Sequence, residues 1–292
     1  MPELPDLEAY REALAPRVIG QPIRALRFAN PFLLRSVQPR PGALVGQTVR
    51  EVRRLGKRLA LGVDGDLWLV LHLMLAGRLQ WLAPGAKLPG KLGLLAIDFA
   101  NGTLALTEAG SKRRASVHIV AGEAALAAHD PGGVEPLAVD GPAFVAALRA
   151  ENHTLKRALT NPHQLAGIGN AYSDEILHRA RLSPLQTTAK LTDDAALRLH
   201  AATVAVLTEW RDRLGAEARA AWPSKVTAFR PEMAVHGKFG QPCPVCGSPV
   251  QRIVNGEHEC NYCARCQTEG RLLADRALSK LLHDLWPRTL AE

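Results

Sequence analysis

No run of apolar residues in this chain of 292 amino acids reaches the ~18 residues that a membrane-spanning helix needs. The most apolar stretch, residues 67–76, is ten residues long and contains His72. Long internal repeats and low-complexity tracts are also lacking, and no basic segment opens the chain, so we expect no secretory signal. These absences predict a protein that works without membrane contact.

What is present is an ordinary globular composition with a positive balance of charge. Hydrophobic residues make up 47% of the chain and charged residues 22%, which excludes wholesale disorder. At ~100–200 residues per domain, the length predicts about two domains. Lysine and arginine number 36 against 28 acidic residues, which gives a net charge of +8. A basic balance of this size points to a polyanionic partner, most simply nucleic acid.

Cysteine is missing from the first 242 residues, and all five cysteines lie within the 24 residues that follow. Four of them form two Cys-x2-Cys pairs that are sixteen residues apart: Cys243, Cys246, Cys263 and Cys266. This spacing is typical of a tetrahedral zinc site in which a hairpin joins the two pairs. Four thiolates leave no open coordination position, so we expect one structural Zn²⁺. The alternative is reduced cysteines without metal, which we expect of the leftover Cys260.

The chain contains strands first and helices afterwards. Over the first ~125 residues the pattern is mainly extended, and its clearest element is a hairpin at 92–107, in which Asn101-Gly102 predicts a type I′ turn. A helix at 6–15, capped by Asp6, interrupts this pattern. The turn-rich stretch 130–137 indicates a linker.

The second half of the chain shows helical periodicity. Residues from ~142 to ~220 are expected to be helical, with a helix over 191–214 that ends at Gly215. After the cysteine segment, an amphipathic helix at 272–286 is stopped by Pro287. The whole pattern predicts an α+β protein with several domains.

The N-terminal sequence Met-Pro-Glu-Leu-Pro suggests chemistry. Aminopeptidases remove Met before a small residue, so we expect the mature chain to begin at Pro2. A free N-terminal proline is a secondary amine that is partly unprotonated near neutral pH, and it can attack an aldehydic carbon to form an iminium ion. The neighbouring Glu3 could move protons. Many proteins begin with Met-Pro, so this feature alone also fits a protein without such chemistry.

Four motifs occur together and in a fixed order: Pro2-Glu3-Leu4-Pro5, an early lysine at Lys57, LAGIGNAYSDEIL at 165–177, and the terminal four-cysteine hairpin. The set closely resembles the formamidopyrimidine-DNA glycosylase/endonuclease VIII family, and the resemblance covers residues 1 to ~267. It implies an N-terminal β-sandwich with flanking helices, a helix–two-turns–helix domain and a zinc-finger β-hairpin, to which this chain adds a terminal helix. The expected segments are the catalytic domain at 1–128, a linker at 129–141, the helical domain at 142–232, the zinc finger at 233–268 and the added helix at 269–292.

The resemblance implies three catalytic residues. Pro2 attacks C1′ of the damaged nucleotide, Glu3 protonates the opening sugar, and Lys57 binds phosphate near the lesion. For Lys57 there is an alternative, because residues 35–58 contain seven arginines and lysines against one acid, and such a face would suit a general phosphate track.

The resemblance also implies DNA contacts in the second half of the chain. Gly167 to Asn170 match the turn before the second motif helix, where Asn170 contributes its side-chain amide to a phosphate, although an asparagine there also suits a plain helix cap. Lys156 is a further phosphate candidate. At the hairpin position where the family carries an arginine, this chain has His258. Either His258 takes that role with less strength, or Arg252 or Arg265 compensates, or base excision is impaired.

Two expectations concern the gap that a flipped base leaves in the duplex. By the resemblance, Leu75 stands where a methionine is expected to fill the gap, and Arg114 or Arg113 pairs with the orphaned base. Ala115 stands about where the family has phenylalanine. For Leu75 the alternative is core packing. The loop that covers the flipped base is expected around 216–227.

The implied function is that of a bifunctional DNA glycosylase and AP lyase of base-excision repair, which works through a Schiff base on Pro2 and cleaves the strand by β- and δ-elimination. Its partner would be double-stranded DNA with a damaged base or an abasic site, bound by a monomer at the nucleoid in the cytoplasm. Two alternatives stay open. One is an AP lyase or atypical-lesion enzyme without 8-oxoguanine activity, and the other is a non-catalytic protein that binds damaged DNA.

Overall fold

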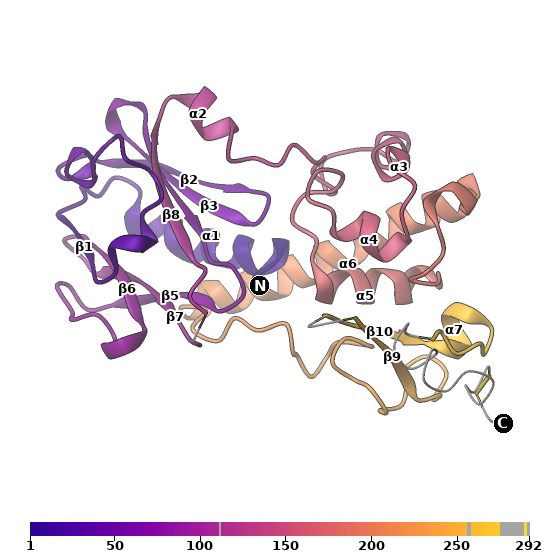
Figure 1. Cartoon of the computed structure of the whole chain (residues 1–292). Coiled ribbons are helices and arrows are strands. Elements are labelled where there is room, and N and C mark those ends of the chain that lie inside the picture. The colour runs from indigo at the N-terminus through magenta and orange to yellow at the C-terminus, as the bar shows by residue number, and fades with distance from the viewer. Residues whose placement is uncertain (111, 256–257, 275–288, 291–292) are drawn as a thin grey trace. The chain divides into compact units, whose positions relative to one another are not determined.

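The computed structural model describes residues 1–110, 112–255, 258–274 and 289–290, without the side chains of residues 255 and 258. The chain folds as two compact units (Figure 1). Unit 1 consists of Met1–Pro131 and Trp210–Thr227, and unit 2 of Gly132–Glu209 and Ala228–Glu292. Residues 210–227, which the sequence placed with the helical domain, therefore belong to unit 1. No helix in the described part is long and apolar enough to cross a membrane.

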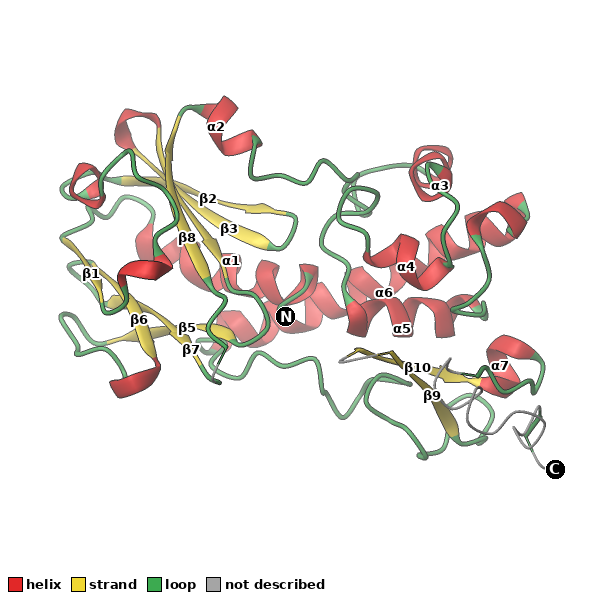
Figure 2. Ribbon diagram, viewed as in Figure 1, coloured by secondary structure: helices red, strands yellow, loops and turns green. Residues whose placement is uncertain are grey.

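Unit 1 contains the expected β-sandwich (Figure 2). One sheet has the order β1-β6-β7-β5, with strands at Ala25–Phe28, Gly93–Asp98, Thr103–Glu108 and Gly77–Leu82. The other has the order β2-β3-β4-β8, with strands at Val49–Leu55, Arg58–Val63, Leu67–His72 and Ser116–Ala121. All pairs are antiparallel. Alternate apolar residues such as Leu59, Leu71 and Leu106 fill one shared core, which is how antiparallel sheets bury one face each.

Helix α1, at Leu4–Val18, begins two residues earlier than the sequence predicted. Glu3 is its N-cap, and Asp6 lies at the third helical position. The carboxylate of Asp6 accepts a hydrogen bond from the Glu3 amide at 3.0 Å, so Asp6 satisfies the helix start from inside the first turn. A short helix, α2 at Glu123–Ala127, follows the sandwich and places Leu126 on its outer face.

The hairpin predicted at 92–107 is present as β6 and β7, but the predicted turn type is wrong. Neither Asn101 nor Gly102 has a positive φ, which a type I′ turn requires at both positions. Phe99 donates its amide proton to the carbonyl of Gly102 at 2.9 Å, so the centre of the turn is Ala100-Asn101, one residue earlier than predicted. A Cβ at Gly102 would lie 2.3 Å from the ring of Trp81, so glycine is needed here for close packing.

Helix α6 runs over Asp193–Ala220 and passes through Gly215, which the sequence analysis took as its end. A Cβ at Gly215 would lie 2.8 Å from the carboxylate of Glu12, so the glycine allows close contact with α1. Arg219 reinforces this contact with an ion pair to Glu12 at 2.6 Å. Tertiary packing therefore continues the helix beyond a residue that usually ends one.

The segment after α6 is anchored in unit 1. Residues 216–220 are helical, so the loop expected at 216–227 is shorter than predicted. The indole N–H of Trp222 donates to the carbonyl of Leu79 at 3.0 Å, and its ring lies 6.0 Å from that of Tyr10 and 6.1 Å from that of Trp81. Val226, 5% exposed, joins the same core.

Unit 2 contains short helices and a hairpin. Besides the part of α6 up to Glu209, its helices are α3 at Gly141–Arg149, α4 at Leu155–Thr160, α5 at Asn170–Ala180 and α7 at Ala264–Thr268. Strands β9 at Val250–Asn255 and β10 at His258–Cys263 form the predicted hairpin between the cysteine pairs. Short 3₁₀ helices occur in both units. Unit 1 contains η1–η4, at Pro31–Leu33, Pro41–Leu44, Asp64–Asp66 and Gly90–Leu92, and unit 2 contains η5 at Thr188–Lys190. The helix predicted at 272–286 lies almost entirely outside the described residues, and residues 272–274 are not helical.

Candidate functional site

Two of the three predicted catalytic residues, Pro2 and Glu3, lie at the start of α1. Pro2 is buried, and Glu3, 3% exposed, caps the helix. Lys57 lies in the turn between β2 and β3, next to Gly56, whose φ is +54°. Burial lowers the pKa of the Met1 amine, and Arg78 and Lys57 act in the same direction against Glu3 and Asp6. The N-terminus therefore lies within electrostatic reach of two acids and two cations, of which Arg78 was not anticipated from the sequence.

His72, at the end of β4, borders this group. Burial lowers its pKa to about 4, and the charges of Arg58 and Lys57 contribute to the shift. The imidazole is therefore neutral at physiological pH, so its ring nitrogens offer one donor and one acceptor beside Lys57.

The candidates for filling the gap lie at one end of the β5–β7 pair. Gly77, the first residue of β5, pairs with Glu108, the last residue of β7. The turn that contains Leu75 precedes Gly77, and the loop that contains Arg114 follows Glu108, so both adjoin the same end of the strand pair. Leu75 is 52% exposed, which excludes the alternative of core packing. The buried carboxylate of Glu108 accepts the amide protons of Arg114 at 2.9 Å and Ala115 at 3.1 Å, which fixes the loop.

Ala115 does not stand on this exposed surface. Its side chain is 5% exposed and belongs to the sandwich core. Lys112, Arg113 and Arg114 before it are exposed. The loop therefore presents cations and no aromatic ring at the position where the resemblance led us to look for phenylalanine.

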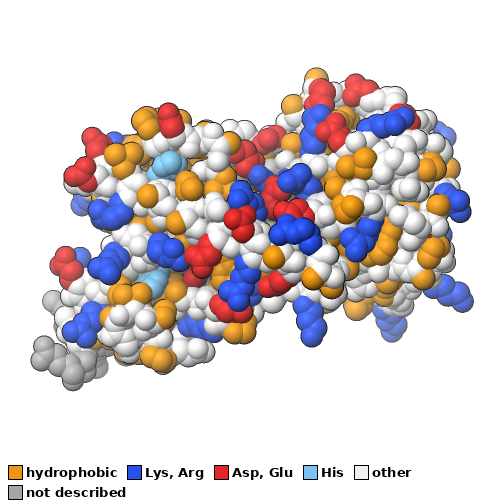
Figure 3. All heavy atoms as spheres, turned by 180° about the vertical axis from the view of Figure 1, so that it is seen from behind, with side chains coloured by type: hydrophobic (Ala, Val, Ile, Leu, Met, Phe, Trp, Pro, Cys, Tyr) orange, Lys and Arg blue, Asp and Glu red, His pale blue; other side chains and the backbone are white. Residues whose placement is uncertain are grey.

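Four of the six arginines in the 35–58 stretch have partners within the protein, and one of them, Arg58, donates to the carbonyl of His129. The other three form ion pairs at 2.6–2.8 Å: Arg50 with Asp64, Arg53 with Glu51, and Arg54 with Glu8. The face drawn in Figure 3 likewise shows lysine and arginine mingled with aspartate and glutamate. This pairing disfavours the alternative of a continuous phosphate track.

In unit 2 the turn before α5 is built as the motif predicts. Gly167 has a φ of +78°, Gly169 is the N-cap, and Asn170 is the first helical residue. The alternative of Asn170 as a plain helix cap is therefore wrong. Its side-chain amide donates to the carbonyl of Glu259 at 2.7 Å, which joins the turn to the hairpin next to His258.

Lys156 lies on α4 and points into unit 2. Its ammonium group, on a side chain 16% exposed, donates to Asp174 at 2.6 Å and to the carbonyl of Asn170 at 2.7 Å. The Asp174 side chain is fully buried and also accepts from His236 Nδ1 at 2.8 Å and from the amide of Asn261 at 3.1 Å. This geometry favours a structural role for Lys156, which supports the turn around Asn170.

Glu175, the neighbour of Asp174, is a second buried acid that sequence reasoning missed. Its carboxylate accepts three backbone amide protons, from Ala234, Val235 and His236, at 2.7–2.9 Å. The sequence offered one signal for this role: two adjacent acids occur in a helix whose other residues are mostly buried. Buried acids need partners, so such a pair indicates internal hydrogen bonds. The two acids fix the segment that leads into the cysteine hairpin.

Three residues of the zinc-finger segment, His258, Arg252 and Arg265, are candidates for the role of the family arginine. His258 opens β10, but its side chain lies outside the described part. Arg252 stacks on the ring of Phe239 at 4.3 Å and pairs with Glu259 at 3.4 Å. Arg265 is exposed on α7.

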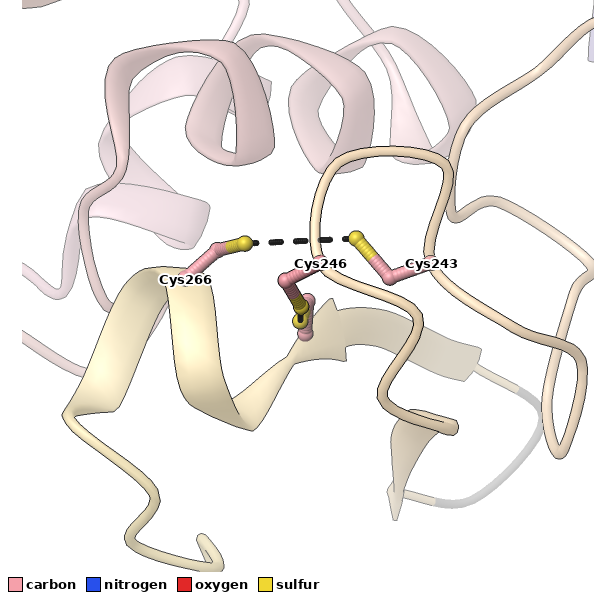
Figure 4. A group of neighbouring side chains, drawn as sticks. Cys243, Cys246 and Cys266 are labelled. Carbon is pink, nitrogen blue, oxygen red and sulfur yellow. Dashed lines mark hydrogen bonds between the residues drawn. The ribbon is translucent and has the colours of Figure 1, made fainter.

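Four sulfur atoms converge in unit 2: those of Cys243 and Cys246 from the turn before β9, and those of Cys263 and Cys266 from the end of β10 and from α7. These atoms all lie within 4.8 Å of one another, with 3.9 Å between Cys243 and Cys266 (Figure 4). Tetrahedral coordination at Zn–S distances of ~2.3 Å places sulfurs ~3.8 Å apart, so the cluster fits zinc. His178 Nε2 lies 3.3 Å from the sulfur of Cys243 and is placed to hold that ligand.

Cys260 lies on β10 outside the four-sulfur cluster, as predicted. Burial raises the pKa of its thiol, and the charge of Asp174 adds to the shift. The thiol therefore stays protonated, which suits a packing residue and not a ligand.

Three segments of the chain match known protein families. Residues 1–119 match the formamidopyrimidine-DNA glycosylase N-terminal domain, residues 133–213 the formamidopyrimidine-DNA glycosylase H2TH domain, and residues 240–268 the zinc finger found in FPG and IleRS. The zinc-finger match and the four-sulfur geometry together show one structural zinc.

Similar proteins and structures span nearly the whole chain. The formamidopyrimidine-DNA glycosylase of Variovorax paradoxus is 34% identical over 274 residues, which cover 91% of this chain and all of that protein. The Lactococcus lactis Fpg in complex with an N7-benzyl-Fapy-dG DNA superposes with a TM-score of 0.82 at 27% identity. The same enzyme bound to DNA with an AP site gives 0.80 at 25%. These structures cover 91% of this chain and at least 99% of theirs.

Proposed function

This chain belongs to the formamidopyrimidine-DNA glycosylase family and is a DNA glycosylase with AP lyase activity, and on that premise we propose which of its residues carry the reaction. The nucleophile is the nitrogen of Pro2. In the chain that keeps Met1, this nitrogen is part of a peptide bond and has no reactive lone pair, so the proposal requires removal of Met1. The freed secondary amine then replaces the Met1 amine beside Glu3 and Lys57.

The reaction follows from the groups around that amine. The Pro2 nitrogen attacks C1′ of the damaged nucleotide, the sugar ring opens as its oxygen is protonated, and the bond to the base breaks as the base leaves with a proton. The resulting iminium ion acidifies the C2′ protons, so loss of one of them expels the 3′ phosphate by β-elimination. Glu3 supplies and removes protons, because it is the acid adjacent to Pro2. Lys57 holds the nearby phosphate by charge.

The substrate in this proposal is duplex DNA that carries a damaged base or an abasic site, bound by one copy of the chain. C1′ is out of reach inside a stacked duplex, so the nucleotide must be flipped out. Leu75 fills the space that it leaves, since this leucine is exposed in a turn that the hydrogen bond from the Gly77 amide to the Leu73 carbonyl closes at 2.9 Å. Arg114, from the loop held by Glu108, contacts the orphaned base. Asn170 binds a phosphate of the same strand through the turn before α5.

A second candidate function is an enzyme for abasic sites or atypical lesions without 8-oxoguanine activity. The observation in its favour is the loop at 112–115, which carries three exposed cations and a buried alanine where an aromatic ring was expected. Direct comparison of cleavage on 8-oxoguanine duplex and on abasic-site duplex separates the two candidates.

The observation that carries the proposal is the buried Glu3 beside the N-terminal amine. The test compares Glu3→Gln with the wild type on two substrates, a duplex with a formamidopyrimidine lesion and a duplex with a preformed abasic site. We expect base release to fall by ~10²-fold or more and cleavage of the abasic site to fall less, because protonation is needed at sugar opening. Glu123→Gln, which alters an exposed ion pair with Arg53, is the control. Equal loss on both substrates would contradict the assignment of Glu3.

A further inference from the structure

The segment of unit 2 that leads into β9 carries two exposed aromatic rings that the proposed reaction does not use. Phe229 is 72% exposed and Phe239 is 48% exposed. In Figure 1 the segment is the orange loop that precedes the hairpin. Large apolar side chains that are left in water in this way indicate contact with another molecule.

Phe229 forms one wall of a small pocket. Its ring stacks on that of His236, with centroids 5.6 Å apart and planes 19° from parallel. The pocket, of about 250 Å³, is further lined by Arg230, Pro231, Gly237 and Lys238. It therefore combines an aromatic wall with two cationic side chains.

Phe239 repeats this combination on the hairpin side. The guanidinium group of Arg252 lies 4.3 Å from the centre of its ring. Glu259 holds the same guanidinium at 3.4 Å, and the Arg252 side chain stays 46% exposed. A cation fixed beside an exposed ring can bind a phosphate while the ring stacks on a base.

Hydrogen bonds within unit 2 hold the wall of the pocket. His236 is fixed by Asp174 through its Nδ1, and the amide of Gly237 donates to Asn261 Oδ1 at 2.8 Å. Gly237 has a φ of +71°, and a Cβ there would lie 2.8 Å from the ring of Phe229. Glycine is therefore required at residue 237, both for the positive φ and for close contact with the ring of Phe229.

Cations interleaved with exposed rings match one class of ligand. Unpaired nucleotides offer a phosphate for each cation and a free base face for each ring, whereas paired bases in a duplex are already stacked on their neighbours. A purely apolar partner would not use Arg230, Lys238 and Arg252. We infer that residues 229–239 and Arg252 bind unpaired nucleotides of a DNA strand, with bases stacked on Phe229 and Phe239. This inference rests on the proposed function only in taking DNA as the partner.

The experiment measures binding of a fluorescent oligothymidylate to the full chain by anisotropy. Phe229→Ala and Phe239→Ala should each weaken this binding by roughly 5- to 150-fold, the usual loss for one base stacked on an aromatic ring. Phe239→Leu should weaken it nearly as much, because leucine keeps the apolar area but has no flat π-face. The matched control is Phe32→Ala, which removes a phenylalanine that is 77% exposed in unit 1. It should leave binding unchanged.

Two results would overturn the inference. One is unchanged oligothymidylate binding in both alanine variants, and the other is full binding by Phe239→Leu, which would indicate an apolar contact such as a protein partner. Cleavage of an abasic-site duplex is measured in parallel. A wild-type chain that cleaves that duplex but does not bind the oligothymidylate contradicts this inference alone. A chain that binds the oligothymidylate but does not cleave contradicts the proposed function alone.

Discussion

Lys156 and Asp174 form a buried ion pair, with 2.6 Å between the ammonium nitrogen and a carboxylate whose side chain is fully buried. The sequence suggested that Lys156 meets a DNA phosphate, but in the structure its charge balances an internal acid. That acid also holds His236 and the amide of Asn261, so the pair lies at the centre of the contacts between α5 and the hairpin.

The first prediction concerns this pair. Lys156→Ala should lower the free energy of unfolding by roughly 3–5 kcal/mol, because it leaves the buried carboxylate of Asp174 without its cation. Urea unfolding of the full chain measures the change. Arg179→Ala, which removes an exposed partner of Glu209, should cost at most about 1 kcal/mol. Equal losses of unfolding free energy in the two variants would show that the Lys156–Asp174 pair stabilises the fold no more than an exposed ion pair does.

The second prediction concerns the anchor after α6. Trp222→Ala should lower the free energy of unfolding by roughly 2–4 kcal/mol, because it removes an indole packed on Tyr10 and Trp81 and its hydrogen bond to Leu79. Limited proteolysis should then cut at 223–225, where Ser224 and Lys225 are exposed. The exposed Phe32→Ala is the control, with an expected change within ~0.5 kcal/mol. Resistance of the Trp222 variant to both tests would contradict the anchor.

The third prediction is about the metal. Metal analysis of protein purified without chelator should give one zinc per chain, and Cys243→Ser should remove it and unfold the hairpin, since zinc binding stabilises such small modules. Cys260→Ser should keep the full zinc content, because Cys260 lies outside the cluster. Zinc loss in the Cys260 variant would show that the ligand set is different.

The fourth prediction follows from His72. Its pKa is about 4 in the folded chain, against an ordinary value of about 6.5, so between these pH values the unfolded state binds more protons. The free energy of unfolding should therefore fall as the pH drops from ~6.5 to ~4, by up to ~1.4 kcal/mol per pH unit from this group. Burial lowers the pKa values of His118 and His129 too, which adds to the slope.

The difference between His72→Gln and the wild type isolates this contribution, since carboxylate protonation is common to both. Urea unfolding at several pH values between 7 and 4.5 should show a shallower slope for the variant. Parallel pH profiles would mean that His72 is not held neutral by burial.

Much of the architecture could be predicted because its signals are local. Asn101-Gly102 between two apolar runs predicts the β6–β7 hairpin, and the spacing of the cysteine pairs predicts the four-sulfur cluster. The glycines before Asn170 predict the turn and the start of α5. In each case a few neighbouring residues determine the backbone geometry.

What could not be predicted depends on residues far apart in the chain. Gly215 is a helix-ending residue by local rules, but contact with Glu12 keeps α6 running. Apart from Lys156, the partners of Asp174 and Glu175 come from residues 59 or more positions later, so the sequence shows two acids without showing which groups they bind. The place of Trp222 in unit 1 could not be predicted either, because its contacts with Tyr10 and Leu79 form only in the folded chain.

The central claim is that the nitrogen of Pro2 forms the covalent intermediate, and borohydride trapping on abasic-site DNA tests it most directly. The wild-type chain should give a trapped protein–DNA complex, and mass spectrometry of that complex should show Met1 removed and the DNA adduct on Pro2. Pro2→Gly should give much less trapped complex while still binding the DNA. Undiminished trapping by Pro2→Gly, or an adduct found on a lysine such as Lys57, would contradict the account.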